Sequence, residues 1–153
     1  MEARLAQIAP SEQFERIIRT YIQACNNADP AAIAACFCPD AVHYFPHWPK
    51  WSGSATIGQN FVDSVRKLGH RWTVDQLIVD ADRRAAVLEW TLFDGMGRTL
   101  RGVDLFVFEP TTVQIREMRP YYAVAPRWDD FACQELRDFD YTGRGYPEAT
   151  KKA

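Results

Sequence analysis

Apolar side chains in the first part of the chain recur every three to four positions, which is the spacing of one helix face. Over residues 11–27 this spacing predicts a first helix. A second, shorter helix is predicted to begin at Pro30, with Asp29 as its N-terminal cap, and to end at Phe37. The β-branched and aromatic run 41–45 then predicts a first strand, which the following proline ends.

A third helix is predicted over residues 57–68, with Gly69 as its stop. From His70 onward the pattern changes to the alternation of apolar and polar positions that is typical of strands. Turn signals divide this region, and the predicted strands cover residues 72–80, 85–94, 99–109 and 112–122. Helices followed by an antiparallel meander predict an α+β fold, with the helices packed on one face of the sheet.

The length of 153 residues fits a single domain spanning 1–153, in which 126–153 form an irregular tail on the domain or on a neighbouring subunit. The composition, 47% hydrophobic and 25% charged, is that of an ordinary globular chain. A net charge of −2 argues against nucleic acid and anionic membrane surfaces as partners, because both attract clustered positive charge. No apolar run is long enough to cross a bilayer.

The N-terminal segment lacks the basic and apolar blocks of a secretory signal, which predicts a cytoplasmic protein. Its four cysteines, including Cys133, are then expected to remain thiols. Cys36 and Cys38 do not have zinc-ligand spacing, so we interpret them as packing residues. Neither a metal nor a cofactor is expected.

The segment Tyr21–Pro46, YIQACNNADPAAIAACFCPDAVHYFP, joins the end of a helix carrying a tyrosine to a short helix and a strand that ends in proline. This arrangement resembles the opening of the ketosteroid isomerase family, the wider group that includes SnoaL-like polyketide cyclases, scytalone dehydratase and nuclear transport factor 2. The resemblance extends over most of residues 14–122. It implies a cone-shaped, curved, mixed or antiparallel sheet wrapped around the N-terminal helices, with an open mouth.

The resemblance also implies site residues. Tyr21 falls on the tyrosine that donates a hydrogen bond to the substrate oxygen, and Asp104, in GVDLFVF, falls on the aspartic acid that binds the same oxygen. The position of the family's catalytic base is Phe45, which cannot transfer a proton. A further departure is that Asn26 and Asn27 stand where dehydratases of this group often carry an aspartate.

Alternation independently places Asp104 on the same strand face as Phe106, in a strand that is apolar on both sides and therefore predicted to be covered on both. A carboxylate in such a place must pair or take up a proton. A protonated Asp104 beside Tyr21 would aim two donors at one oxygen. The alternative is a structural role, in which Asp104 pairs with Arg101, Arg119 or the backbone.

Three residues are candidates for the missing base. His43 shares the strand face of Phe45 and titrates near neutral pH. His47 lies in the loop after the strand, and Glu89 lies in a segment whose alternation does not determine its face. His43 could also form a dyad with Asp104.

The chain is rich in aromatic residues, which line sites for flat apolar ligands and also pack dimer interfaces. We predict that some of them bind substrate and that Trp48 and Trp51 form a lid, and we expect a homodimer. The predicted substrate-binding residues are His47, Trp48, Trp51, Trp72, Glu89, Trp90, Phe106 and Tyr121.

Together these features predict a small cofactor-independent enzyme that isomerises, cyclises or dehydrates a hydrophobic, ring-containing carbonyl or hydroxy compound. In it Asp104 and Tyr21 hold the substrate oxygen and His43 moves the proton. The alternative is a non-catalytic module of the same fold that binds small molecules or proteins. A metal-dependent enzyme is the third hypothesis, which no cluster at ligand spacing supports.

Overall fold

The computed structural model describes residues 8–46, 48–123 and 137–145. In chain order the elements are α1 (Pro10–Asn26), α2 (Pro30–Ala35), β1 (Phe37–His43), β2 (Trp51–Ser52), α3 (Ser54–Leu68), β3 (Arg71–Asp80), β4 (Ala85–Phe93), β5 (Thr99–Phe108) and β6 (Ile115–Ala123).

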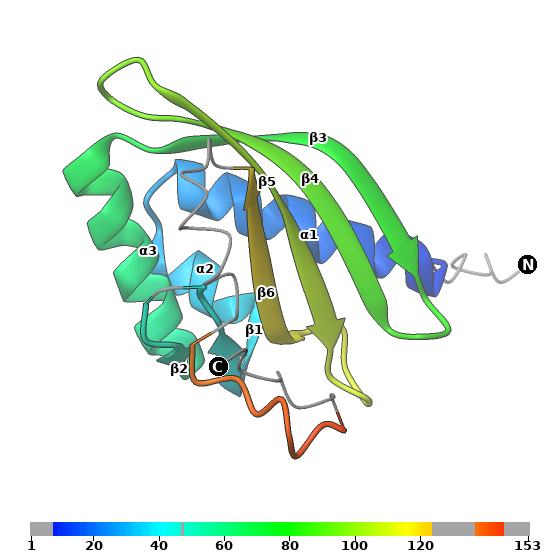
Figure 1. Ribbon diagram of the computed structural model, residues 1–153. Coiled ribbons are helices and arrows are strands. Elements are labelled where there is room, and N and C mark those ends of the chain that lie inside the picture. The colour runs from blue at the N-terminus through cyan, green and yellow to red at the C-terminus, as the bar shows by residue number, and fades with distance from the viewer. Residues whose placement is uncertain (1–7, 47, 124–136, 146–153) are drawn as a thin grey trace, which may run out of the picture.

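The strands form one six-stranded sheet in the order β2-β1-β6-β5-β4-β3. All neighbours are antiparallel except β1 and β6, which are parallel. The sheet curves without closing, and the three helices lie on one side of it (Figure 1). This is the mixed α+β architecture that the sequence pattern and the resemblance predicted.

Local chemistry explains the helix ends. The side chain of Asp29 accepts a hydrogen bond of 3.0 Å from the backbone N–H of Ala32, and Pro30 occupies the first helical position, where its missing N–H leaves no vacant bond. Gly69 ends α3 in the left-handed conformation, with a φ of 67°. Both terminal signals were predicted correctly from the sequence.

The transition from α2 to β1 differs from the prediction. The helix ends at Ala35 rather than Phe37, and β1 begins at Phe37 and ends at His43 instead of covering 41–45. The reason is pairing with β6, in which Phe37 lies opposite Ile115. Pro39 is tolerated because the register with β6 shifts between Phe37 and Val42.

The core lies between the concave sheet face and the helices. Tyr21, from α1, packs edge-on against Phe37, Phe61 and Phe106, with ring centroids 5.4, 5.6 and 6.0 Å away. Cys36 and Cys38 are buried free thiols in the same core, as their interpretation as packing residues requires, whereas Cys133 lies outside the described residues.

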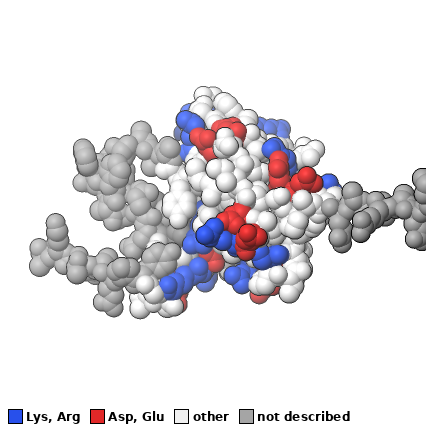
Figure 2. Space-filling view, turned by 90° about the vertical axis from the view of Figure 1, so that its right-hand side faces the viewer, with Lys and Arg blue, Asp and Glu red and all other residues white. Residues whose placement is uncertain are grey.

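In β5, Asp104, Phe106 and Phe108 face the core, and the intervening side chains face outward. The outward side chains are only partly buried, so the expectation that this strand is covered on both faces is wrong for the described residues. The cause is that the helices cover only the concave side of the sheet. On the molecular face shown in Figure 2, acidic and basic side chains are interspersed, and no large field of one sign forms.

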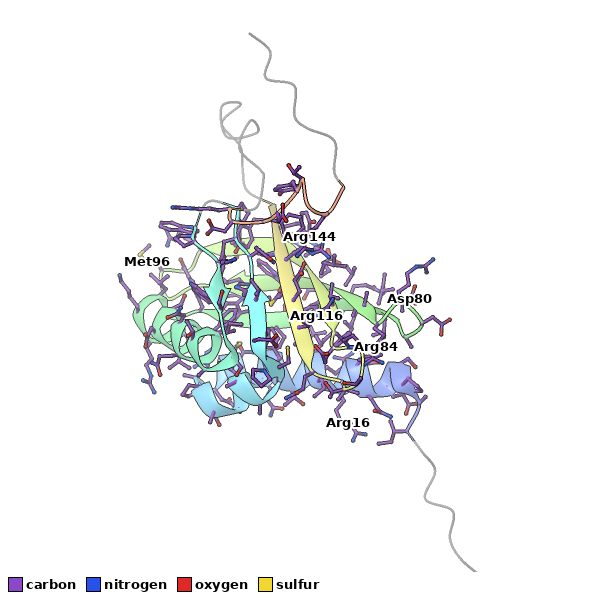
Figure 3. All side chains as sticks on the ribbon, turned by 90° about the horizontal axis from the view of Figure 1, so that it is seen from below. Arg16, Asp80, Arg84, Met96, Arg116 and Arg144 are labelled. Carbon is purple, nitrogen blue, oxygen red and sulfur yellow. The ribbon has the colours of Figure 1, made fainter. Side chains whose placement is uncertain are left out.

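Residues 137–145 pack across the end of β1 and the outer side of β6. The backbone N–H of Arg137 donates to the carbonyl of Phe45 at 2.8 Å, and Arg144 reaches Glu117 with two hydrogen bonds of 3.0 and 2.9 Å (Figure 3). Arg144 also lies 4.1 Å from the ring centroid of Phe139. The other parts of the predicted tail, 126–136 and 146–153, are outside the described residues.

The turn between β4 and β5 contacts the end of α3. The backbone N–H of Gly95 donates to the carbonyl of Leu68 at 2.9 Å. A Cβ on Gly69 would lie 2.9 Å from the Cα of Gly95, closer than real Cβ atoms come to backbone. Gly69, with its positive φ and this close approach, is therefore needed here, and at Gly95 a Cβ would make a tight contact of 3.3 Å with the Leu68 carbonyl oxygen. No helix among the described residues is long and apolar enough to span a membrane.

Candidate functional site

A cavity of about 160 Å³ lies between the concave sheet face and the helices α1 and α3. Its walls are mostly aromatic and aliphatic, which is typical of small-molecule sites. The lining residues are Tyr21, Ile22, His43, Phe45, Trp51, Phe61, Ser64, His70, Trp72, Trp90, Leu92, Leu100, Asp104, Met118, Pro120 and Tyr122.

Six of the predicted site residues line this cavity: Tyr21, His43, Trp51, Trp72, Trp90 and Asp104. Phe106 does not; it is fully buried behind the wall against Tyr21. His47 is outside the described residues. Trp48 is 68% exposed and lies away from the cavity wall, so of the two predicted lid tryptophans only Trp51 contacts the cavity.

Two further predicted residues lie on the opposite face of the sheet. Glu89 alternates with the buried Trp90 and forms an ion pair with Arg101 on the outer face. Tyr121 is 54% exposed, and its neighbour Tyr122 faces the cavity in its place. Successive strand residues point to opposite faces, so Tyr121 points away from the cavity that Tyr122 lines. Glu89, whose face the sequence left open, likewise points away from the cavity that Trp90 lines.

Asp104 enters the cavity from the middle of β5, where it lies opposite Leu88 of β4 and Pro120 of β6. Its side chain is almost completely buried, and its Oδ1 atom has no hydrogen-bond partner in the part of the chain that the structure describes. Burial raises the pKa of Asp104 from 3.8 to about 7. The indole of Trp90 partly opposes this rise, although its N–H does not meet the geometry of a full hydrogen bond. Both protonation states of Asp104 are therefore accessible near neutral pH.

Two phenols accompany this carboxyl group. Burial raises the pKa of Tyr21, and the negative charges of Cys25 and Asp104 would raise it further. The pKa of Tyr122 is also raised, first by burial and then by Asp104. Both hydroxyls thus stay protonated beside Asp104 at neutral pH, and each has one proton to donate; that of Tyr21 also interacts with the Cys25 thiol.

His43 enters from the end of β1 and is enclosed by aromatic rings. The ring centroids of Phe45, Phe61 and Trp51 lie 4.0, 5.3 and 5.4 Å from that of the imidazole. Neither ring nitrogen has a hydrogen-bond partner among the described residues, so His43 and Asp104 are not joined in the dyad that the sequence suggested. Burial lowers the pKa of His43 to about 3, which leaves the imidazole neutral at physiological pH.

Asn26, at the position of the dehydratase aspartate, has a different task here. Its amide nitrogen donates to the carbonyl of Trp72, and its carbonyl oxygen accepts from the Trp72 N–H, both at 2.8 Å. Asn26 therefore pairs with the edge strand β3 as another strand would and holds the cavity-lining Trp72 in place.

A second cavity, of about 280 Å³, adjoins the first. His70, Leu92 and Leu100 line both cavities, and Asp94, Arg98 and Thr99 complete the outer one. The Nδ1 atom of His70 lies 3.3 Å from the Ser64 hydroxyl. Sequence reasoning missed His70 because the short link between α3 and β3 has no periodicity, and it missed Ser64, Leu92 and Leu100 because they read as ordinary helix and strand residues.

No group of three or more histidine, cysteine or acidic side chains within the described ranges is arranged to hold a metal ion. The chemistry that the described cavity residues offer is proton transfer and hydrogen bonding, supplied by Asp104, His43 and the two phenols.

Comparison with known proteins places this geometry in a family. The model of the SnoaL-like domain matches residues 18–118. No curated protein matches the chain. A crystal structure of a protein of unknown function with a cystatin-like fold, from Methylobium petroleophilum PM1, is 39% identical, covers 94% of this chain and 96% of its own, and superimposes with a TM-score of 0.85.

More distant structures share the fold. A candidate ketosteroid isomerase from Kribbella flavida DSM 17836 is 19% identical with a TM-score of 0.67, over 79% of this chain and 85% of its own. A candidate polyketide cyclase from Xanthomonas campestris pv. campestris is 17% identical with a TM-score of 0.62, over 82% of this chain and 98% of its own. With the family model covering residues 18–118 and a relative of 39% identity over nearly the whole length, this chain belongs to the SnoaL-like domain family.

Proposed function

We propose that this protein is a cofactor-independent acid–base enzyme that acts on a hydrophobic, ring-containing carbonyl or hydroxy compound. Isomerisation, cyclisation and dehydration are all compatible with this site. In each of them a proton is moved to or from the substrate while the negative charge on a nearby substrate oxygen is stabilised. The observation that carries the proposal is the presence of two buried side chains, Asp104 and His43, with unpartnered polar atoms in one apolar cavity.

Buried polar atoms without a hydrogen-bond partner lower the stability of the folded protein. A buried polar group without a partner costs about 1–3 kcal/mol, and native proteins keep few of them. A ligand with a polar oxygen on a flat apolar frame would supply the missing partners and fill the aromatic walls. The cavity is therefore suited to a ligand with these two features.

The pKa values of Asp104 and His43 indicate which of the two side chains transfers the proton. A general base works best when its pKa lies near the working pH. The pKa of Asp104, at about 7, meets this condition, whereas a pKa of about 3 makes His43 a weak base. We therefore assign the proton transfer to Asp104, whereas the sequence suggested that His43 moves the proton and that Asp104 holds the substrate oxygen. The neutral imidazole of His43 is suited to hydrogen bonding with the ligand.

In an isomerisation, the Asp104 carboxylate would take a proton from the carbon next to the carbonyl. The carbonyl oxygen, which gains the negative charge, would accept hydrogen bonds from Tyr21 or Tyr122, and Asp104 would return the proton to a different carbon. Removing one donor to such an oxygen costs on the order of 100-fold in rate. The fold shared with candidate isomerases and cyclases is consistent with this chemistry.

The test uses exchange of the acidic α-hydrogens of 2-tetralone, a small bicyclic ketone, for deuterium in heavy water, followed by NMR. Wild-type protein should accelerate the exchange above the buffer rate, and Asp104→Asn should lower that acceleration by about 100-fold or more without loss of folding. The buffer rate with wild-type protein, or equal rates for the two proteins, would contradict the proposal.

The second candidate function is non-catalytic binding in the same cavity. It is favoured by Phe45, an aromatic residue that lines the cavity at the position of the family's base. Binding of 2-tetralone, seen as a change in tryptophan fluorescence without acceleration of exchange, would support this alternative.

A further inference from the structure

The outer cavity differs from the inner one in chemistry. The inner walls are aromatic and aliphatic around a few polar atoms, whereas the outer cavity carries an arginine and an aspartate together with His70 and Thr99. Three side chains, His70, Leu92 and Leu100, form the boundary between the two. A ligand that fills the inner cavity and continues past this boundary would thus meet a polar environment.

Arg98 is the residue with donors available at this place. Its Nε atom forms an ion pair of 2.6 Å with the Asp94 carboxylate, which is almost fully buried. Its two terminal nitrogens make no hydrogen bond with the described part of the chain. Arg98 is 67% exposed, so these donors remain accessible.

Asp94 holds the backbone N–H and the Nε atom of Arg98 in place. One of its oxygens accepts the backbone N–H groups of Met96 and Arg98, at 2.9 and 2.8 Å, and the other holds the Arg98 Nε atom. The turn itself is fastened to the end of α3 by the bond from Gly95 to Leu68, and Met96, at its tip, lies beside α3 (Figure 3). The guanidinium is thus held at one edge of the outer cavity by a rigid turn.

His70, at the boundary itself, lines the outer cavity together with Arg98. Its Nδ1 atom is engaged with Ser64, and the other ring nitrogen makes no hydrogen bond within the described ranges. Its electrostatic surroundings include both Asp94 and Arg98, so the three groups lie in one neighbourhood. His70 and Arg98 can therefore both contact one ligand that extends from the inner into the outer cavity.

We propose that the outer cavity is a subsite for a carboxylate at the far end of an elongated, flat ligand, whose ring portion occupies the inner cavity beside Asp104. Arg98 binds the carboxylate through its terminal nitrogens, and His70 contacts the connecting portion. This inference rests on the proposed function in using the same inner cavity, but it concerns binding, and its test needs no turnover.

The test compares two phenols by quenching of tryptophan fluorescence, because Trp51, Trp72 and Trp90 line the inner cavity. The short probe, 2-naphthol, has no outer group, and the long probe, 4′-hydroxybiphenyl-4-carboxylate, carries a carboxylate at the end opposite its hydroxyl. Arg98→Gln should weaken binding of the long probe by about tenfold, the size of one charge-assisted hydrogen bond, and change that of 2-naphthol less than about twofold. The affinity of Arg98→Lys for the long probe should lie between those of the wild type and Arg98→Gln. Lysine keeps the positive charge but lacks the paired N–H donors of the planar guanidinium.

Arg101→Gln is the matched control, since Arg101 is similarly exposed and paired with an acidic residue, Glu89, but on the outer sheet face. It should leave both affinities unchanged. Equal effects of Arg98→Gln and Arg101→Gln, an equal effect of Arg98→Gln on both probes, or failure of the long probe to bind wild-type protein would each overturn the subsite. Absence of deuterium exchange with 2-tetralone would overturn the proposed catalysis and leave this result standing.

Discussion

The side chain of Asn26 makes two hydrogen bonds of 2.8 Å with the backbone of Trp72, one as donor and one as acceptor. An amide can do both, whereas a carboxylate can only accept. The end of α1 is thereby joined to the edge strand β3, directly behind a wall of the cavity. The asparagine at this position is thus explained by its bonds to the backbone, with no need for a catalytic role.

Replacing Asn26 with aspartate should destabilise the fold by about 1–3 kcal/mol, because the Trp72 carbonyl loses its donor and faces a negative charge. Urea unfolding measures this change. Asn27→Asp is the control, because it adds the same charge at the same helix end to an exposed residue whose side chain makes no hydrogen bond in the described structure. Equal losses for the two variants would show that the pairing with Trp72 contributes nothing.

Asp104 should make stability depend on pH. Its pKa is about 7 when folded and 3.8 ordinarily, so between these values the folded chain keeps a proton that the unfolded chain has released. Stability from this group is therefore complete below about pH 3.8 and is lost as pH rises to 7, by up to about 1.4 kcal/mol per pH unit.

Urea unfolding of the wild type and of Asp104→Asn from pH 4.5 to 8 measures this effect, since the variant does not titrate. The free energy of unfolding of the wild type should fall relative to that of the variant up to about pH 7 and then run parallel to it. A difference that stays constant with pH would mean that Asp104 is ionised in the folded protein across the whole range.

The effect of His43 on folding stability should have the opposite dependence on pH. Its pKa is about 3 when folded and 6.5 ordinarily, so on acidification below 6.5 the unfolded chain binds a proton that the buried imidazole does not. The wild type should therefore lose stability relative to His43→Gln as the pH falls from 6.5 towards 4.5. A wild type and variant that respond to acid in parallel would show that the imidazole is protonated in the folded state. Because this window overlaps that of Asp104, the two effects oppose each other in the wild type and become visible in the single variants.

Gly102 makes room for the indole of Trp90. A Cβ at this position would lie 2.3 Å from the Cζ2 atom of Trp90 and 2.8 Å from the carbonyl oxygen of Tyr121. Gly102→Ala should therefore displace Trp90, destabilise the protein by about 1–3 kcal/mol and weaken binding of 2-naphthol.

A double-mutant cycle with Trp90→Phe tests the cause. Phenylalanine lacks the atoms that clash, so Gly102→Ala should cost less in that background than in the wild type. The same cost in both backgrounds would place the strain at the carbonyl of Tyr121 instead.

The sequence predicted most of the fold because its periodicities change clearly from three-four spacing to alternation at His70. It misplaced the start of β1 because pairing of Phe37 with Ile115, 78 positions later, overrides the helical character of the preceding alanines. Asp104 could be found because an acidic residue in an apolar strand is unusual. Glu89 could not be assigned a face, since its neighbours on both sides are apolar, and only the register opposite Val103 shows that it points outward.

The contact between Gly69 and Gly95 has a consequence for ligand selection. It brings α3 and the β4–β5 turn together through backbone atoms, and these elements carry Ser64, which lines the inner cavity, and Arg98, which lines the outer one. The spacing between the two elements at this point is therefore set by the backbone and not by the side chains that line the cavities. Substitutions of those side chains can change which chemical groups are accepted without disturbing the contact at Gly69.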